Sequence, residues 1–281
     1  MYLFQGQFYS SLDEVPVEIL NAFIEQNTLN ETVIFLEGKP LYWEEHYLRL
    51  MASMRILRME IPMSFTMEQL QSSMAALCLF EGKSKFTGRV RLSVVKTTAP
   101  TPGQAIPATA YAIKLLEVKE PFSFHVQELP IDLYKDHYVA AGLYASLENA
   151  YASWRTMAWT YVHENGYCDG ILLNNNKQVV ETLHGALFLV NGSTITTPAL
   201  GVGNRKGIYR QQLISLLQKE EKFEVLEAEI SPFALQKADE LFVLDDAQGL
   251  FSIGQYRKKK FDYVVTQVIW ELLLSQIQKG H

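Results

Sequence analysis

Two kinds of hydrophobic periodicity alternate along the chain, and this alternation limits the fold more than any other feature of the sequence. From Trp43 to Met59 the apolar residues recur at the spacing of an amphipathic helix. From Arg89 to Lys96 apolar and polar residues alternate one by one, which is the pattern of a half-buried strand. We therefore expect an α+β or α/β fold in which helices pack against sheets.

The same periodicities predict the remaining elements and a division into two domains. We expect further helices at about residues 66–79, 149–164 and 207–218 and from about 262, and strands at residues 109–116 and near Ile171, Leu187, Thr194, Phe223 and Leu241. The pattern weakens at residues 118–124, where Pro121 interrupts it. We therefore expect an N-terminal α/β domain at residues 1–118, a linker at 119–124 and a C-terminal domain at 125–281.

Composition narrows the class of protein. The 281 residues are 48% hydrophobic and 20% charged, which is typical of a soluble globular protein with a sizeable core. The net charge of −6 disfavours nucleic acid as a partner. Cys78 and Cys168 are too few for a disulfide framework and lack the spacing of a zinc site, so we expect a reducing, cytoplasmic setting and no metal. No apolar run approaches the length of a membrane span, and we expect neither export nor insertion.

General catalytic motifs are absent from the sequence. It contains no glycine-rich phosphate loop, no HExxH, no GxSxG and no CxxC. The six histidines are scattered, and a lone histidine is more often structural than catalytic. Composition and general motifs alone therefore indicate only a soluble two-domain α/β protein.

Four longer blocks are more specific, because they occur together and in a fixed order. They are GKPLYWEEHYLRLMASMRILRMEIP (38–62), HENGYCDGILLNNNKQVVET (163–182), TTPALGVGNRKGIYR (196–210) and ADELFVLDDAQGLFSIGQYR (238–257). In this order they resemble the class IV (fold type IV) pyridoxal-phosphate enzymes, related to branched-chain aminotransferases and aminodeoxychorismate lyase. The ending AQGLFSIGQYRKKKF resembles lyase-like members in particular.

The resemblance implies a fold, a cofactor and an assembly. It implies the two-domain fold of D-amino-acid-aminotransferase-like proteins, with a pseudo-barrel sheet and helices in the C-terminal domain. It also implies a homodimer with pyridoxal phosphate between the domains, bound to one lysine as a Schiff base. The expected ligand is a small amino acid or an amino-chorismate-like molecule.

The resemblance also assigns cofactor contacts to particular residues. Arg49 matches the arginine of the E-H-x-x-R-L helix, which in the family pairs with the cofactor phosphate through its planar fork of donors. Glu181 matches the glutamate that hydrogen-bonds the pyridine nitrogen and keeps it protonated. Gly207, Ile208 and Tyr209 match the turn that opens a helix, where amides and the helix dipole receive the phosphate.

The position expected to hold the catalytic lysine is Glu148. A carboxylate can neither form a Schiff base nor act as the amine that transfers the proton, so normal transamination is not expected. Lys135, thirteen residues upstream, is a candidate substitute.

Other expected cofactor contacts have changed as well. Gly185 and Ala186 stand where relatives have polar residues, and Asn30 replaces an aromatic residue. The sequence LDDA, residues 244–247, replaces hydroxyl residues that commonly face the phosphate.

Two hypotheses about function follow. One is a degenerate homologue that serves as a binding or interaction protein. The alternative is an active lyase or aminotransferase that uses a substitute lysine or a non-covalent cofactor.

Overall fold

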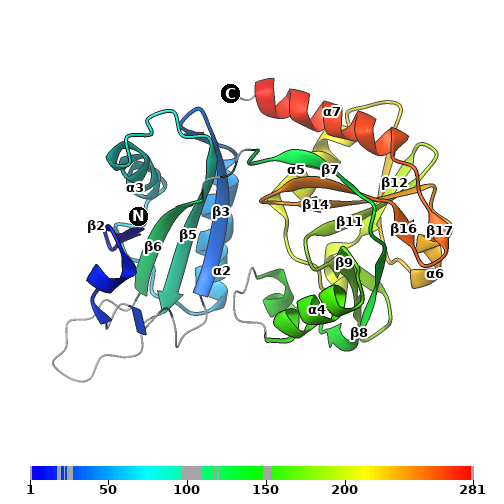
Figure 1. Ribbon diagram of the computed structural model, residues 1–281, viewed down its shortest axis with the longest axis horizontal. Coiled ribbons are helices and arrows are strands. Elements are labelled where there is room, and N and C mark those ends of the chain that lie inside the picture. The colour runs from blue at the N-terminus through cyan, green and yellow to red at the C-terminus, as the bar shows by residue number, and fades with distance from the viewer. Residues whose placement is uncertain are drawn as a thin grey trace. The chain divides into compact units, whose positions relative to one another are not determined.

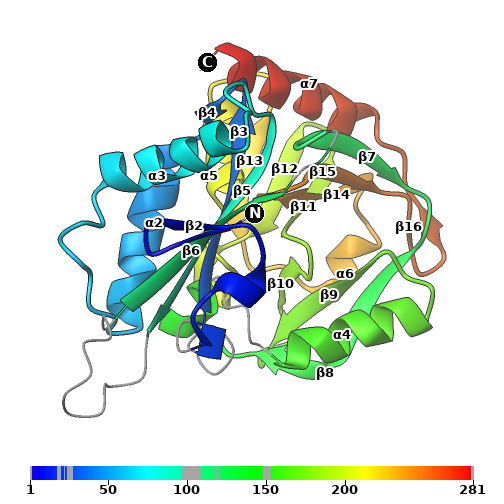
Figure 2. The same ribbon diagram turned by 60° about the vertical axis from the view of Figure 1, so that its left-hand side comes forward.

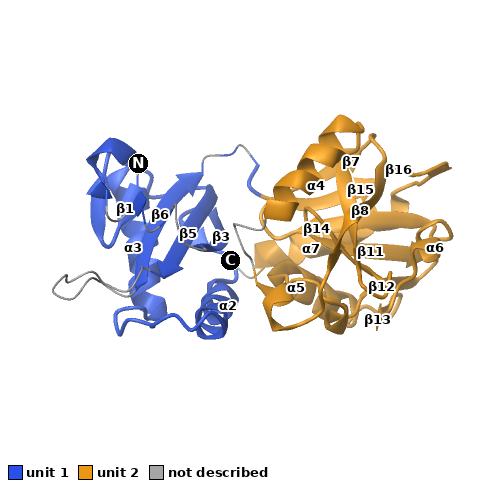
Figure 3. Ribbon diagram, turned by 90° about the horizontal axis from the view of Figure 1, so that it is seen from below, with its two compact units in different colours: residues 1–121, 148–151 blue, residues 122–147, 152–281 orange. Residues whose placement is uncertain are grey.

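The computed structural model describes residues 2–17, 20, 21, 23, 28–96, 109–116, 118, 120–147 and 153–279. These residues form two compact units, coloured separately in Figure 3. Among them, the first unit contains the residues up to Pro121, and the second begins at Phe122. Each unit has its own apolar core, so each is described by itself.

The first unit is built on a six-stranded antiparallel sheet with the strand order β2-β1-β6-β5-β3-β4. Its strands are β1 (Tyr2–Phe4), β2 (Gln7–Tyr9), β3 (Thr28–Leu36), β4 (Lys39–Pro40), β5 (Gly88–Lys96) and β6 (Thr109–Leu116). The alternation predicted for β5 is present, because Val90, Leu92 and Val94 are buried whereas Arg91 is exposed. One face of this sheet therefore carries the core.

Two helices cover that core, α2 (Trp43–Ile56) and α3 (Met67–Phe80), as Figure 2 shows. Met54 and Met74 are fully buried and belong to the same apolar cluster as Val33 of β3. The Thr66 side chain caps α3 by accepting a hydrogen bond from the Gln69 amide at 3.1 Å. The apolar stripes that predicted the two helices are thus the surfaces that they bury.

The second unit contains two sheets (Figure 1). The five-stranded sheet has the order β10-β9-β8-β16-β17, and the six-stranded sheet has the order β13-β12-β11-β14-β15-β7. Their strands are β7 (Ser123–Gln127), β8 (Ile131–Val139), β9 (Asp169–Asn174), β10 (Val179–Thr182), β11 (Ala186–Asn191), β12 (Thr194–Pro198), β13 (Glu224–Ala228), β14 (Glu240–Asp245), β15 (Gly249–Ile253), β16 (Gln255–Tyr256) and β17 (Lys259–Lys260). Ile131 and Ile171 of the first sheet share one apolar cluster with Leu187, Leu241 and Ile253 of the second. The two sheets therefore pack around a common core.

Helices surround these sheets. They are α4 (Ser153–Glu164), α5 (Ile208–Leu217), α6 (Pro232–Leu235) and α7 (Val264–Lys279). Short 3₁₀ turns lie at Leu12–Glu14 in the first unit and at Leu143–Ser146 and Leu200–Val202 in the second. The α7 helix was expected from about Asp262 but begins at Val264. The Glu240 carboxylate fixes this start, because it accepts hydrogen bonds from the amides of Val265 and Thr266, each at 2.8 Å.

The mixed helix and sheet class predicted from the sequence is confirmed. The predicted helices at 43–59 and 66–79 correspond to α2 and α3, and the described part of the one predicted at 149–164 is α4. The end of the expected linker, Ser123 and Phe124, lies in β7. None of the helices in the described ranges combines the length and the apolar character needed to cross a membrane.

Candidate functional site

Glu181 lies near the end of β10, and its carboxylate is held by two arginines. Its Oε1 atom accepts hydrogen bonds from Arg155 Nη2 at 2.8 Å and from Arg205 Nε at 2.9 Å. Its Oε2 atom accepts a hydrogen bond from the backbone amide of Arg205 at 3.1 Å. The Glu181 side chain is 5% exposed, so these are shielded, charge-assisted contacts.

The two guanidinium groups are fixed by carbonyl groups of the segment that follows β10. Arg155 donates from Nη1 to the Leu183 carbonyl at 3.1 Å, and Arg205 donates from Nη2 to the His184 carbonyl at 3.2 Å. Arg155 also lies over the Trp154 ring, 4.9 Å from its centroid. Glu181 therefore faces two positively charged groups that have fixed positions.

The first amides of α5 bind a carboxylate of the same chain. Ile208 donates its backbone N–H to Asp246 Oδ2 at 2.9 Å, and Tyr209 donates to Asp246 Oδ1 at 3.1 Å. Gly207 precedes the helix, and a Cβ atom at this position would lie 3.2 Å from Asp246 Oδ1. The family resemblance assigns these two amides to the cofactor phosphate, and here they bind Asp246.

The loop after β14 places Asp246 at this helix end. Asp245 Oδ1 accepts hydrogen bonds from the amides of Ala247 and Gln248, both at 2.7 Å, and so closes a tight turn. Burial raises the pKa of Asp245, an effect that these amides and His184 oppose and that the Asp246 charge reinforces. The turn built by Asp245 orients its neighbour toward α5.

His184 connects this region to β9. Its Nδ1 atom lies 3.1 Å from Asp169 Oδ2, and its ring meets the Trp159 ring edge to face, with centroids 4.7 Å apart. Burial lowers the pKa of His184, but the Asp169 hydrogen bond and the charges of Asp169 and Asp245 outweigh it and raise the pKa above its usual value. A protonated His184 would be a third cation in a region that carries several carboxylates.

Gly185 and Ala186 follow His184, and the close approach of the backbone explains the glycine. A Cβ atom at position 185 would lie 2.1 Å from the Leu244 carbonyl oxygen. The Gly185 amide donates to Thr182 Oγ1 at 3.1 Å, which closes the turn between β10 and β11. A larger side chain therefore cannot enter this turn unless the backbone moves.

Arg49, in the first unit, contacts Glu31. It donates from Nε to Glu31 Oε1 at 2.9 Å and from Nη2 to Glu31 Oε2 at 2.7 Å, and His46 Nδ1 lies 2.8 Å from Oε2. Burial would raise the pKa of Glu31, but Arg49 and His46 together hold it below its usual value. Asn30 accepts a hydrogen bond from Ser93 Oγ at 2.7 Å. Arg49 is thus one member of a partly buried ionic group that joins α2 to β3.

The remaining candidates lie elsewhere. Glu148 lies outside the described residues. Lys135 lines a cavity of about 530 Å³ in the second unit, whose lining does not include Glu181, Arg205 or Asp246. Among the residues that the structure describes, no three His, Cys, Asp or Glu side chains are grouped so as to hold a metal ion.

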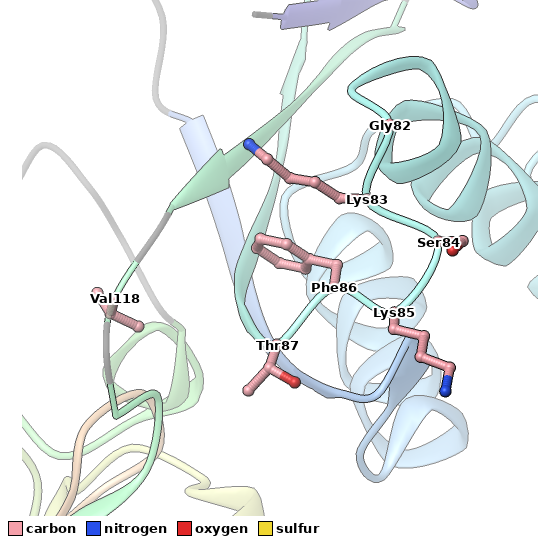
Figure 4. Close-up of a pocket in the computed structure, with 7 residues that line it drawn as sticks. All are labelled: Gly82, Lys83, Ser84, Lys85, Phe86, Thr87 and Val118. Carbon is pink, nitrogen blue, oxygen red and sulfur yellow. The ribbon is translucent and has the colours of Figure 1, made fainter.

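A cavity of about 620 Å³ in the first unit is lined by residues 82–87 and Val118. Figure 4 shows that the Lys83 and Lys85 ammonium groups point away from each other. Lys83 forms an ion pair with Glu81 at 3.0 Å. Because the polar groups of this cavity do not converge, it is not a candidate for a catalytic site.

Sequence reasoning missed Arg155, Arg205 and His184. Arg205 and His184 lie beside residues that the sequence singled out, Gly207 and Gly185 respectively. Their proximity to Glu181 and Asp169, however, depends on how the strands pair. Arg155 lies on a separate helix, and no local pattern in the sequence connects it with Glu181.

Comparisons with known proteins agree with this geometry at the level of the family. The sequence profile of the family described as amino-transferase class IV matches residues 28–256. A probable branched-chain-amino-acid aminotransferase from Aquifex aeolicus is 24% identical over 277 residues, which cover 88% of this chain and 83% of that protein.

Solved structures share the fold. The branched-chain amino acid aminotransferase of Escherichia coli matches with a TM-score of 0.84 and 18% identity, covering 98% of this chain and 94% of that one. A putative 4-amino-4-deoxychorismate lyase from Legionella pneumophila matches with a TM-score of 0.79 and 19% identity, covering 97% of each chain. The expected fold type is therefore confirmed.

Proposed function

The chain belongs to the amino-transferase class IV family, and we propose that it is a degenerate member, one that keeps the fold but does not carry out Schiff-base transamination. The family depends on pyridoxal phosphate. The single observation that carries the proposal is the Asp246 carboxylate on the Ile208 and Tyr209 amides. Those amides are the phosphate donors that the family resemblance assigns to this chain.

The phosphate side of the expected site does not fit the cofactor as the chain stands. A phosphate group at the start of α5 would have to displace Asp246, and each charge-assisted hydrogen bond lost is worth roughly 1.5–3 kcal/mol. If Asp246 stayed close by, two like charges about 4 Å apart would repel by roughly 4 kcal/mol at an effective dielectric of 20, before solvent screening. Asp246 therefore disfavours phosphate in either arrangement.

The contact expected for the pyridine ring of the cofactor has also become less favourable. In the family role, Glu181 would stabilise a positive charge on the pyridine nitrogen. Here Arg155 and Arg205 already supply two positive charges to that carboxylate. A third cation at this place would be repelled by both guanidinium groups, so Glu181 is poorly suited to keep the nitrogen protonated.

The alternative is an active lyase or aminotransferase with a substitute lysine or a non-covalent cofactor. For Lys135 to be that substitute, its amine would have to lie near Glu181 or near the start of α5. Lys135 lines a cavity that includes neither Glu181 nor the α5 amides. This favours the hypothesis of a degenerate family member. Glu148, at the family lysine position, has no amine to offer.

We place the protein in the class of binding or interaction proteins, acting as a cytoplasmic homodimer. A small amino acid or an amino-chorismate-like molecule is the ligand that the family relationship suggests. The Phe8 and Phe80 rings stack at 4.4 Å and are 36% and 56% exposed, and Leu79 beside them is 62% exposed. Apolar surface of this kind supports association between copies of the chain.

Borohydride reduction in the presence of pyridoxal phosphate tests the proposal. Borohydride fixes a cofactor that is linked to lysine, so the purified protein is incubated with pyridoxal phosphate, reduced and digested for mass spectrometry. We expect no stable pyridoxyl-lysine peptide and no yellow absorbance band that stays with the protein once free cofactor is removed. A pyridoxyl-lysine peptide in stoichiometric yield would contradict the proposal. If that peptide carried Lys135, it would identify the substitute lysine.

A further inference from the structure

Three cationic side chains line the second-unit cavity of about 530 Å³, although the chain as a whole carries a net charge of −6. Lys135 comes from β8, Lys177 from the turn between β9 and β10, and Arg257 from the turn between β16 and β17. Glu229 is the one acidic residue in the lining, and it accepts a hydrogen bond from Gln178. Within the described part of the chain, neither Lys135 nor Lys177 has a carboxylate partner, and Arg257 Nε lies 3.9 Å from Asp132 Oδ1.

Two of these cations occupy strained backbone positions. Lys177 has a φ of 60° and Arg257 a φ of 54°, in the left-handed region that favours glycine or asparagine. Both residues lie in short turns between neighbouring strands, where asparagine is the ordinary choice. The chain thus places long cations at two positions where glycine or asparagine would make the fold more stable. Backbone strain of this kind clusters at functional sites.

Apolar and aromatic side chains form another part of the cavity lining. The buried residues Leu133, Leu173 and Ile230 line it, together with the side chains of Tyr138 and Phe233. Phe233 is 74% exposed and Tyr138 is 37% exposed, so each aromatic side chain offers accessible surface to a ligand. A lining that combines apolar side chains with a few charged groups is typical of small-molecule sites of this volume.

From this combination we propose that the cavity binds a small aromatic carboxylate. The carboxylate contacts Lys177 and Arg257, with Lys135 as a third positive group, and the ring packs on the apolar part of the lining against Tyr138 and Phe233. The site is separate from Glu181 and Asp246, so it does not depend on the proposed loss of pyridoxal-phosphate chemistry. It gives the second unit a binding function of its own.

The test measures binding of 2-naphthoate to the full chain by titration calorimetry. The neutral 2-naphthamide has the same shape without the charge, and inorganic phosphate carries charge without the ring. We expect 2-naphthoate to bind with a dissociation constant of about 1 mM or tighter, as suits a ligand of this size. We expect 2-naphthamide to bind about tenfold more weakly, and phosphate not to compete at the same concentration.

Two substitutions locate the site without unfolding the turns. Lys177→Asn and Arg257→Asn remove the charge but suit the left-handed backbone, so the thermal midpoint should stay the same or rise. Each should weaken 2-naphthoate binding about tenfold. Arg58→Asn is the matched control, because Arg58 is also a cation at positive φ, 52°, but lies in the first unit, and its binding should equal that of the unchanged protein.

Three results would overturn the proposal. The first is no heat of binding for 2-naphthoate at millimolar concentration. The second is equal affinity for 2-naphthoate and 2-naphthamide, or competition by phosphate at equal concentration, which would show that charge and ring are not recognised together. The third is unchanged binding in the folded Lys177→Asn and Arg257→Asn variants, which would place the ligand elsewhere.

Discussion

At the scale of single residues, the second unit pairs its own polar groups at the positions that the family resemblance assigns to cofactor contacts. Asp246 accepts hydrogen bonds from the two α5 amides, and Glu181 accepts hydrogen bonds from Arg155 and Arg205. A buried donor or acceptor without a partner costs free energy, so groups that no longer meet a ligand need substitutes within the chain. Under the proposed function Asp246 is such a substitute, with its two oxygens in place of those of a phosphate.

Replacement of Asp246 tests this exchange. Asp246→Ala leaves the Ile208 and Tyr209 amides without their carboxylate, and we expect unfolding in urea to require about 1–2 kcal/mol less. Inorganic phosphate at millimolar concentration should then raise the thermal midpoint of the variant more than that of the unchanged protein. Asp136→Ala removes an exposed carboxylate on β8 and serves as the control. If phosphate stabilises all three proteins equally, the α5 amides are not an anion site.

At the scale of elements, the sequence predicted the parts whose periodicity is long enough to read. The α2 and α3 helices and the β5 strand each present an apolar stripe or alternation over at least nine residues. Two-residue strands such as β16 and β17 have no such pattern and exist only through their pairing partners.

The candidate site could be predicted only in part. Glu181 and the Gly207 turn could be singled out because they lie in ordered sequence blocks, and their cofactor roles stay predictions. Arg49, singled out in the same way, lies in the first unit and contacts Glu31. The direction of the Asp246 side chain could not, because it depends on the turn that Asp245 closes. The partners of Glu181 come from α4 and from the segment before α5, which only the folded chain brings to β10.

The turn between β10 and β11 should tolerate no side chain at position 185. Gly185→Ser would restore a polar side chain where relatives have one, but its Cβ would lie 2.1 Å from the Leu244 carbonyl oxygen. We expect a loss of about 2–4 kcal/mol in unfolding free energy and no gain in cofactor binding. Gly201→Ala is the matched control, since a Cβ there meets no atom within 4 Å. Stability equal to that of the control would show that the turn can relax.

At the scale of the whole molecule, we predict that the protein is a homodimer. The family relationship suggests this assembly, and the exposed Phe8, Leu79 and Phe80 side chains supply apolar surface for it. Light scattering at micromolar concentration should give twice the chain mass of 32.1 kDa. A monomer at this concentration would contradict the prediction.

We propose that the expected cofactor site has been remodelled and has not merely lost one lysine. If only the lysine were missing, Glu148→Lys would recover a lysine-linked cofactor, since Glu181 and the α5 amides would still receive it. With Asp246 on the amides and two arginines on Glu181, two or three lost contacts weaken binding by a factor of about a thousand or more.

The most direct measurement is therefore a pyridoxal phosphate titration of Glu148→Lys, followed by absorbance and by borohydride reduction. We predict binding no tighter than millimolar, with no yellow band on the protein after free cofactor is removed and no pyridoxyl group at position 148. Tight, yellow binding by this single variant, with the cofactor fixed at position 148, would show that the pocket is intact and would contradict the proposed function.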